Sequence, residues 1–183
     1  MENIKHVGTS QLETERLRLR RYTANDAYAY ACVDAEHGEV AWEEPFITEQ
    51  TSDLGQVISQ YNQPDFYWWA IVEKASDSIV GGILTINANE HMQSCEIAYV
   101  INAKFRNNGY ASEALKRVLA FLLIDVAYNR VQAGHLADNP ASGRVMEKAG
   151  MKYEGTLRQD NRNSKGILTD SCIYGLLRED LLA

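Results

Sequence analysis

The residues best suited to chemistry lie between positions 95 and 115, where a lone carboxylate precedes a glycine-containing loop. Glu96 stands in an apolar run of strand-forming residues, Cys95 to Ile101. A polar turn that contains Arg106 and Gly109 follows. Apolar residues then recur at helical spacing, at Ala111, Ala114, Leu115, Val118, Leu119 and Leu122. The pattern predicts a strand, a tight loop and a helix in succession.

A joint of this kind is suited to holding an anion. The first N–H groups of a helix have no acceptor within the helix and lie at the positive end of its dipole, so they can bind a pyrophosphate. Gly109 would allow the backbone to approach such a ligand, and Arg106 would add a charge-assisted contact. An ordinary strand-to-helix connection explains the same residues equally well.

The segment Arg106 to Ala111 resembles the Arg/Gln-x-x-Gly-x-Gly/Ala motif of the GNAT N-acetyltransferase superfamily. The resemblance extends to Glu-Ile-x-Tyr at 96–99 and to Asn-Pro-Ala-Ser at 139–142, and it covers residues 14–178. The chain is most similar to the branch of ribosomal-protein N-terminal (alanine/serine) acetyltransferases. This resemblance implies acetyl-CoA as co-substrate and direct transfer of its acetyl group to a primary amine, of a protein N-terminus or a small molecule.

The resemblance also implies which residues contact acetyl-CoA. Family members bind the cofactor through the end of a strand, the loop after it and the start of a second helix. A backbone N–H near Val100 or Ile101 would polarise the thioester oxygen. The matching positions are Tyr99, Val100, Ile101, Arg106, Asn107, Asn108, Gly109, Tyr110, Ala111, Ser112, Asn139, Ser142 and Met146.

Acid and base groups are predicted from the needs of the reaction. A free α-amine has a pKa of about 8 and a lysine amine one of about 10.4, so a base that removes the proton helps at neutral pH. Glu96 is the predicted base, and a solvated strand residue is the alternative. Many relatives place a tyrosine acid where this chain has Met146, so Ser142, alone or with water, is predicted to protonate the leaving thiolate. Asn139 either contacts the cofactor arm or caps its helix, and both roles are compatible.

Three residues are predicted to meet the acceptor. In the family the first helices and their connector form one wall of the acceptor groove, and here that connector holds Trp42 and Glu43. Both are suited to a cationic amine, but a core tryptophan beside a solvated acid is an equally good explanation. Trp68 is assigned to the same groove, although sheet packing is the commoner role of a strand tryptophan.

The composition of the chain limits which partners, metal sites and cellular locations are expected. The chain has 183 residues, a net charge of −7 and a pI near 5.1, which argues against nucleic-acid binding and suits a cationic partner.

Three separated cysteines, at 32, 95 and 172, indicate neither disulfides nor a zinc site, and no metal is expected. No apolar run is long enough for a bilayer and no apolar core follows Met1, so a cytoplasmic location is expected. A homodimer is left open.

The flanking patterns predict an α/β fold: one GNAT-like domain at 14–183, with a mixed, strongly twisted sheet of about seven strands and helices on both faces. Residues 1–13 lack periodicity and are expected to be a flexible arm. Further strands are expected at 17–22, 66–73, 79–86, 130–136, 153–157 and 167–177, and further helices at 26–32, 51–61 and 140–149. A non-catalytic acyl-CoA sensor remains the alternative to an enzyme, because the family's usual tyrosine is missing.

Overall fold

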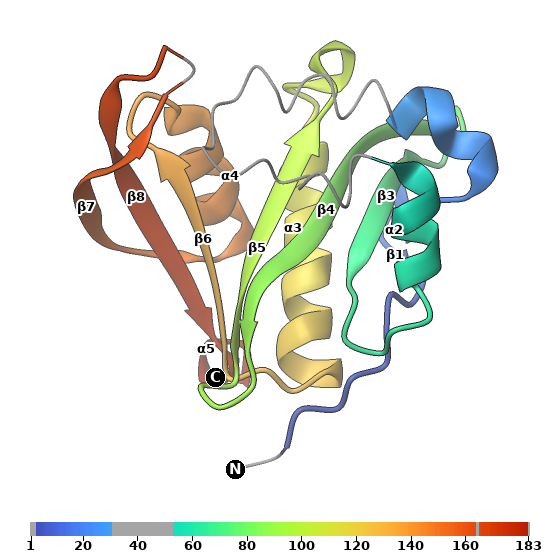
Figure 1. Cartoon of the computed structure of the whole chain (residues 1–183), viewed down its shortest axis with the longest axis horizontal. Coiled ribbons are helices and arrows are strands. Elements are labelled where there is room, and N and C mark those ends of the chain that lie inside the picture. Colours follow the sequence, from blue (N-terminus) through green and yellow to red (C-terminus); the bar gives the residue numbers. More distant parts are fainter. Residues whose placement is uncertain (1–2, 31–52, 164, 183) are drawn as a thin grey trace.

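The computed structural model describes residues 3–30, 53–163 and 165–182, and in these ranges eight strands form one sheet (Figure 1). The strand order is β1-β2-β3-β4-β5-β6-β8-β7, and only the β5–β6 pair is parallel within the described part. The strands are β1 (Leu12–Glu13), β2 (Leu17–Arg20), β3 (Trp68–Glu73), β4 (Ser78–Asn89), β5 (Ser94–Ile101), β6 (Arg130–Leu136), β7 (Lys152–Arg162) and β8 (Leu168–Leu177).

Helices cover both faces of the sheet, with α3 and α4 on one side and α2 on the other (Figure 1). The predicted α/β fold with a mixed sheet is therefore confirmed, with one short strand more than expected. The helical segments are η1 (Ala24–Asp26), α2 (Leu54–Gln60), η2 (Ala103–Phe105), α3 (Tyr110–Ala120), the π-helical η3 (Phe121–Asp125), α4 (Pro140–Ala149) and α5 (Arg178–Leu182). Residues 27–30 continue η1 as a helix.

Alternation along β5 explains why both faces are covered. Cys95 and Ile97 point to the cluster that packs under α3 with Leu115, while Ala98 joins a second cluster with Val57 of α2. Five residues of α3 are buried in the first cluster: Tyr110, Ala114, Leu115, Val118 and Leu119. The last four were predicted from helical spacing, whereas Tyr110 was not, and the predicted Ala111 is only partly buried. Apolar burial on both faces thus holds β5 at the centre of the sheet.

Residues 1–13 differ from the flexible arm that we expected, as far as they are described. The N–H of Lys5 donates to the Val126 carbonyl at 2.8 Å, and the Thr9 hydroxyl donates to the Phe66 carbonyl at 2.8 Å. Leu12 is buried in the core, and β1 pairs with β2. The partners in these contacts lie far away in the sequence, so the local pattern of apolar residues could not predict that this segment is ordered.

A carboxylate organises the chain as it leaves β2. Asp26 accepts the Thr23 N–H at 2.6 Å and the Thr23 hydroxyl at 2.9 Å, in a capping box that confirms the predicted helix start. Its oxygens also accept two bonds from Arg20, at 2.7 and 2.9 Å. Burial opposes ionisation of Asp26, but the bonds from Arg20 and Thr23 outweigh it and hold the pKa of the carboxyl below its ordinary value.

We therefore expect Asp26→Asn to reduce stability at neutral pH. The folded-state pKa of Asp26 lies below the unfolded value of about 3.9, so the ionised group stabilises the fold above that pH. Loss of the capping contacts should lower Tm by about 2–4 °C at pH 7, equivalent to about 1 kcal/mol. The difference from wild type should vanish as the pH falls through the folded-state pKa.

Calorimetry between pH 7 and strongly acidic buffer would measure this difference. Asp160→Asn is the control, because Asp160 is exposed on β7. A deficit for Asp26→Asn that stayed constant down to acidic pH would show that the charge of Asp26 contributes nothing.

Candidate active site

The parallel pairing of β5 and β6 is short. It covers Ser94–Glu96 against residues 130–132, with Glu96 opposite Gln132 as the last pair. Beyond that point β5 continues beside β4 and β6 continues beside β8, so the two strands diverge (Figure 1). A gap therefore opens in the middle of the sheet directly after Glu96, and α3 and α4 both begin at its open end.

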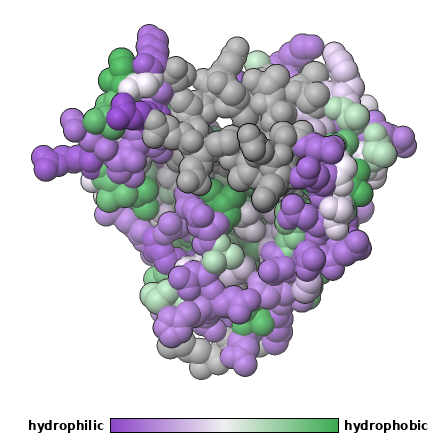
Figure 2. Space-filling model, in the orientation of Figure 1, coloured by the Kyte–Doolittle hydropathy of each residue, from purple (hydrophilic) through white to green (hydrophobic). Residues whose placement is uncertain are grey.

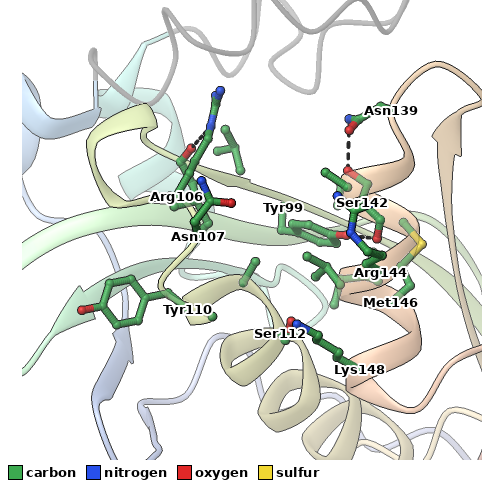
Figure 3. Close-up of a pocket in the computed structure, with 18 of the residues that line it drawn as sticks. Tyr99, Arg106, Asn107, Tyr110, Ser112, Asn139, Ser142, Arg144, Met146 and Lys148 are labelled. Carbon is green, nitrogen blue, oxygen red and sulfur yellow. Dashed lines mark hydrogen bonds between the residues drawn. The ribbon is translucent and has the colours of Figure 1, made fainter.

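A cavity of about 400 Å³ occupies this gap (Figure 3). It is lined by β5, the loop after it, the first turn of α3, one residue each of β4 and β6, and the cavity-facing side of α4 with its N-cap. Every residue that we predicted to act in catalysis or cofactor binding lines it, with the exception of Asn108. Segments separated by more than 40 residues in the sequence thus meet around one space.

Asn108 shapes the loop instead of facing the cavity. Its side-chain amide donates to the Phe105 carbonyl at 3.1 Å and to the Arg106 carbonyl at 3.2 Å, while its own carbonyl accepts from Arg16 at 3.0 Å. The assignment of Asn108 as a cofactor contact therefore stays a prediction, which concerns its backbone and not its side chain. A motif places a residue in a loop but does not show which side of the loop its side chain takes.

Gly109 is required for its backbone conformation. It is the N-cap of α3 with φ of +80°, in the left-handed region that favours glycine. A Cβ built at this position would point toward Arg16 Nη2, 3.5 Å away, and Arg16 does not line the cavity. The first backbone bond of α3 runs from the Glu113 N–H to the Gly109 carbonyl, so the N–H groups of residues 110–112 have no helical acceptor.

Arg106 is tied to the end of β5. Its Nε donates to the Ile101 carbonyl at 3.1 Å, which turns the side chain back across the loop toward the gap. The side chain remains exposed and lines the cavity mouth (Figure 3). Arg106 and the first residues of α3, whose N–H groups have no helical acceptor, thus line the same cavity, and both features suit an anion.

Ser142 lies at the start of α4 between two polar side chains. Its hydroxyl accepts from Asn139 Nδ2 at 3.1 Å, and its carbonyl accepts from the Tyr99 hydroxyl at 3.1 Å (Figure 3). Burial raises the pKa of Tyr99, so its hydroxyl stays a donor. Asn139 occupies the N-cap position, but its side chain makes no capping bond, which corrects the expected cap.

Glu96 is half-buried where the gap begins. Its Oε2 accepts from Asn87 Nδ2 at 3.1 Å, so the carboxylate is oriented by a side chain of β4. Next to it, burial and the charge of Glu96 raise the pKa of the Cys95 thiol to about 12. Cys95 therefore stays a neutral thiol, and Glu96 is the one carboxylate among the residues described around the cavity.

Sequence reasoning missed two cations on α4. Arg144 and Lys148 are exposed, lie one helical turn apart and line the cavity, and neither has an ion-pair partner among the described residues (Figure 3). Helical spacing could have found them, because Ala141, Arg144, Val145 and Lys148 form one stripe. With Arg106 they give the cavity three cations against one carboxylate, in a chain of net charge −7.

Of the three predicted acceptor residues, the structure describes Trp68. Trp42 and Glu43 lie outside the described residues. Trp68 is 3% exposed and packs against the rings of Tyr22 and Tyr30, with centroids 6.4 and 6.0 Å away. The assignment of Trp68 to the acceptor groove is corrected accordingly, because its place is in the core of the sheet.

The described residues, 3–30, 53–163 and 165–182, contain neither a candidate metal site nor a membrane-spanning helix. Over these ranges no group of three or more His, Cys, Asp or Glu side chains could hold a metal ion. Cys95 and Cys172 are free thiols. No helix in the same ranges is long and apolar enough to cross a membrane.

Comparisons with known proteins agree with this geometry. The family described as "Acetyltransferase (GNAT) domain" matches residues 16–152. The "Uncharacterized N-acetyltransferase YoaA" of Bacillus subtilis (strain 168) is 29% identical over 175 residues, which span 91% of this chain and 96% of that protein. A GNAT-family acetyltransferase of Bacillus anthracis is 26% identical over 93% of this chain and 99% of its own, with a TM-score of 0.75.

A further solved structure is similar in fold alone. The ribosomal-protein-S5-alanine acetyltransferase of Vibrio fischeri has a TM-score of 0.78 at 16% identity, over 93% of this chain and 98% of its own.

The bonding of Asn139 leads to a prediction on stability. Because its side chain does not cap α4, Asn139→Ala should change Tm by less than about 1 °C. Asp53→Ala is the matched comparison, since the Asp53 carboxylate caps α2 by accepting the Gly55 N–H at 2.8 Å. That variant should lose about 1 kcal/mol, or about 2–4 °C in Tm. Equal losses in thermal melts of the two variants would mean that Asn139 does cap its helix.

Proposed function

The chain belongs to the GNAT acetyltransferase family, and from this premise we propose that it moves the acetyl group of acetyl-CoA to a primary amine by direct transfer, with Glu96 as general base. The observation that carries the proposal is the gap between β5 and β6. It brings a carboxylate and an anion-binding helix start to one cavity. Transfer between two bound substrates requires both groups at one site.

The charge of the cavity supports acetyl-CoA as the ligand. The pyrophosphate would lie at the N-terminus of α3, where the N–H groups of residues 110–112 are without helical acceptors. Arg106, Arg144 and Lys148 would attract its phosphates from two sides. A cavity so cationic within an acidic chain fits a ligand with several phosphates better than it fits a cationic one.

Glu96 is proposed to take the proton of the attacking amine. Its bond from Asn87 orients the carboxylate, and its place where the strands part gives it access to the cavity. A carboxylate within hydrogen-bond reach, directly or through one water, can accept this proton as the N–C bond forms, because the attacking nitrogen then becomes positively charged and acidic. The amine is proposed to bind beside Glu96, because this is the one carboxylate among the described residues that line the cavity.

The thioester oxygen is proposed to be polarised by a backbone N–H of β5. The Asn102 N–H donates to the Val80 carbonyl at 2.9 Å, so residue 102 faces β4. Because successive residues of a strand alternate in direction, the N–H of Ile101 points the other way, toward the gap. This alternation favours Ile101 over Val100, and a donor fixed in a strand stabilises developing charge without reorganisation.

Ser142 is proposed to protonate the leaving thiolate. Its Oγ accepts from Asn139, which leaves its own proton available to another acceptor. Met146 has no titratable group, and the Tyr99 hydroxyl donates to the Ser142 carbonyl. Among the residues of α4 that line the cavity, Ser142 therefore has the hydroxyl that can donate a proton to the sulfur.

The acceptor is proposed to be the amine of a protein N-terminus or of a small molecule. The names of the relatives as N-acetyltransferases support a turning-over enzyme over the non-catalytic sensor. A homodimer and a cytoplasmic location stay predictions.

Glu96→Gln tests the base. The variant keeps the shape of the side chain but cannot accept a proton, so turnover should fall about a hundredfold at pH 7. Acetyl-CoA affinity should stay unchanged, and the defect should shrink at high pH, where more of the amine is already neutral. The assay follows thiol release with an amine panel of ribosomal-protein N-terminal peptides, polyamines and amino sugars.

Glu90→Gln is the control for this test, because Glu90 is exposed and does not line the cavity. Wild-type turnover by Glu96→Gln across the pH range would contradict the assignment. Absence of thiol release from the wild type with every amine would instead favour the sensor.

The two cations of α4 give a separate prediction on ligand binding. Arg144→Ala and Lys148→Ala should each weaken acetyl-CoA binding about tenfold, the loss expected for one charge-assisted contact. Each should also reduce the salt dependence of the dissociation constant. Titration calorimetry at two salt concentrations measures both effects, with Lys116→Ala as a control on the exposed side of α3. Affinities equal to that of the control would remove Arg144 and Lys148 from the site.

A further inference from the structure

The loop that begins α3 is held from behind by a residue far away in the sequence. Arg16, just before β2, donates through Nη1 to the Asn108 carbonyl at 3.0 Å and through Nε to Glu113 Oε2 at 2.7 Å. Its guanidinium carbon also lies 4.9 Å from the centre of the Tyr110 ring. One side chain thus contacts the loop, the first residue of α3 and its first turn.

Glu113 is the centre of this arrangement. In addition to the side chain of Arg16, its Oε1 accepts the Thr14 hydroxyl at 2.6 Å and the Arg16 N–H at 3.0 Å. Burial opposes ionisation of Glu113, but these bonds outweigh it and hold the pKa of its carboxyl below the ordinary value. Glu113 is therefore charged, one turn from the start of a helix that is proposed to bind pyrophosphate.

The arrangement is anchored to the sheet. The Lys74 N–H donates to the Arg16 carbonyl at 2.9 Å, and Lys74 Nζ donates to the Thr14 carbonyl at 2.6 Å. The Tyr110 hydroxyl is hydrogen-bonded to Glu73 at the end of β3. The loop is thereby fixed to a buried strand rather than only to its own helix.

Two residues of the loop have a left-handed backbone. Asn107 has φ of +63° and Gly109 has φ of +80°. Glycine adopts this region freely and asparagine tolerates it, so these angles do not by themselves hold the loop in one conformation, and contacts from outside the loop are needed to do so. The contacts to Arg16 flank this segment, on the side away from the cavity.

From these contacts we propose that Arg16 is a positioning residue for acetyl-CoA. It holds the loop in its anion-binding conformation before the ligand arrives, and it neutralises Glu113, whose charge would otherwise repel the phosphates. The inference rests on the proposed function. Arg16 touches no ligand in this account, because it does not line the cavity, and acts through the backbone at residues 108–110.

The test is Arg16→Gln, with Arg18→Gln as the matched control. Arg18 lies two residues further along the chain, in β2, and its guanidinium pairs with Asp77 and not with a residue of the loop or of α3. Arg16→Gln should raise the dissociation constant of acetyl-CoA about tenfold by calorimetry, and the KM for acetyl-CoA with it. The KM for the amine and kcat at saturating acetyl-CoA should stay at wild-type values.

Arg16→Lys keeps the charge but loses the planar fork, and it guards against a variant that fails to fold. It should retain the salt dependence of wild-type binding while binding acetyl-CoA several-fold more weakly. Wild-type affinity in both Arg16 variants, with lowered Tm alone, would overturn the proposal and leave the proposed function intact. A wild-type protein that does not bind acetyl-CoA would refute the proposed function itself.

Discussion

The site depends on a single constraint, which is that the parallel pairing of β5 with β6 ends at Glu96. The pairing partners explain why it ends there: β5 is held by β4 as far as Ile101, and β6 is held by β8 as far as Leu136. After the two strands separate, β5 remains hydrogen-bonded to β4 and β6 remains hydrogen-bonded to β8. The edge of β5 that faces the gap is therefore unpaired, but neither strand loses its antiparallel partner. The end of this pairing at Glu96 thus accounts for the cavity, for the unpaired backbone donors of β5 and for the position of the Glu96 carboxylate.

A second constraint is the distribution of charge. The chain carries a net charge of −7, yet the cavity holds three cations and one carboxylate. The carboxylate comes from β5, whereas the cations come from the loop after β5 and from α4, so different elements supply the two signs of charge. Glu113 would disturb this pattern, and its neutralisation by Arg16 lets the start of α3 keep its positive character.

Much of this architecture could be predicted from local patterns. Alternation and helical spacing located β5, α3 and β6, and Gly109 and Gly150 mark backbone turns at positive φ. What could not be predicted depends on the tertiary structure. Sequence cannot show that Asn139 bonds Ser142 instead of capping α4, or that Trp68 is enclosed by rings from other elements. The contacts of Arg16 could not be predicted, because its partners lie more than 90 residues away in the sequence.

The account claims that acetyl-CoA binds in the gap between β5 and β6 and against the start of α3. Amide hydrogen exchange with and without acetyl-CoA tests this claim most directly, since bound ligand protects the N–H groups it covers. Protection should rise at residues 107–112 and at 99–101, while the edge strand β7 (Lys152–Arg162) should exchange at the same rate in both samples. Unchanged exchange at residues 99–112, or protection confined to other parts of the chain, would contradict the account.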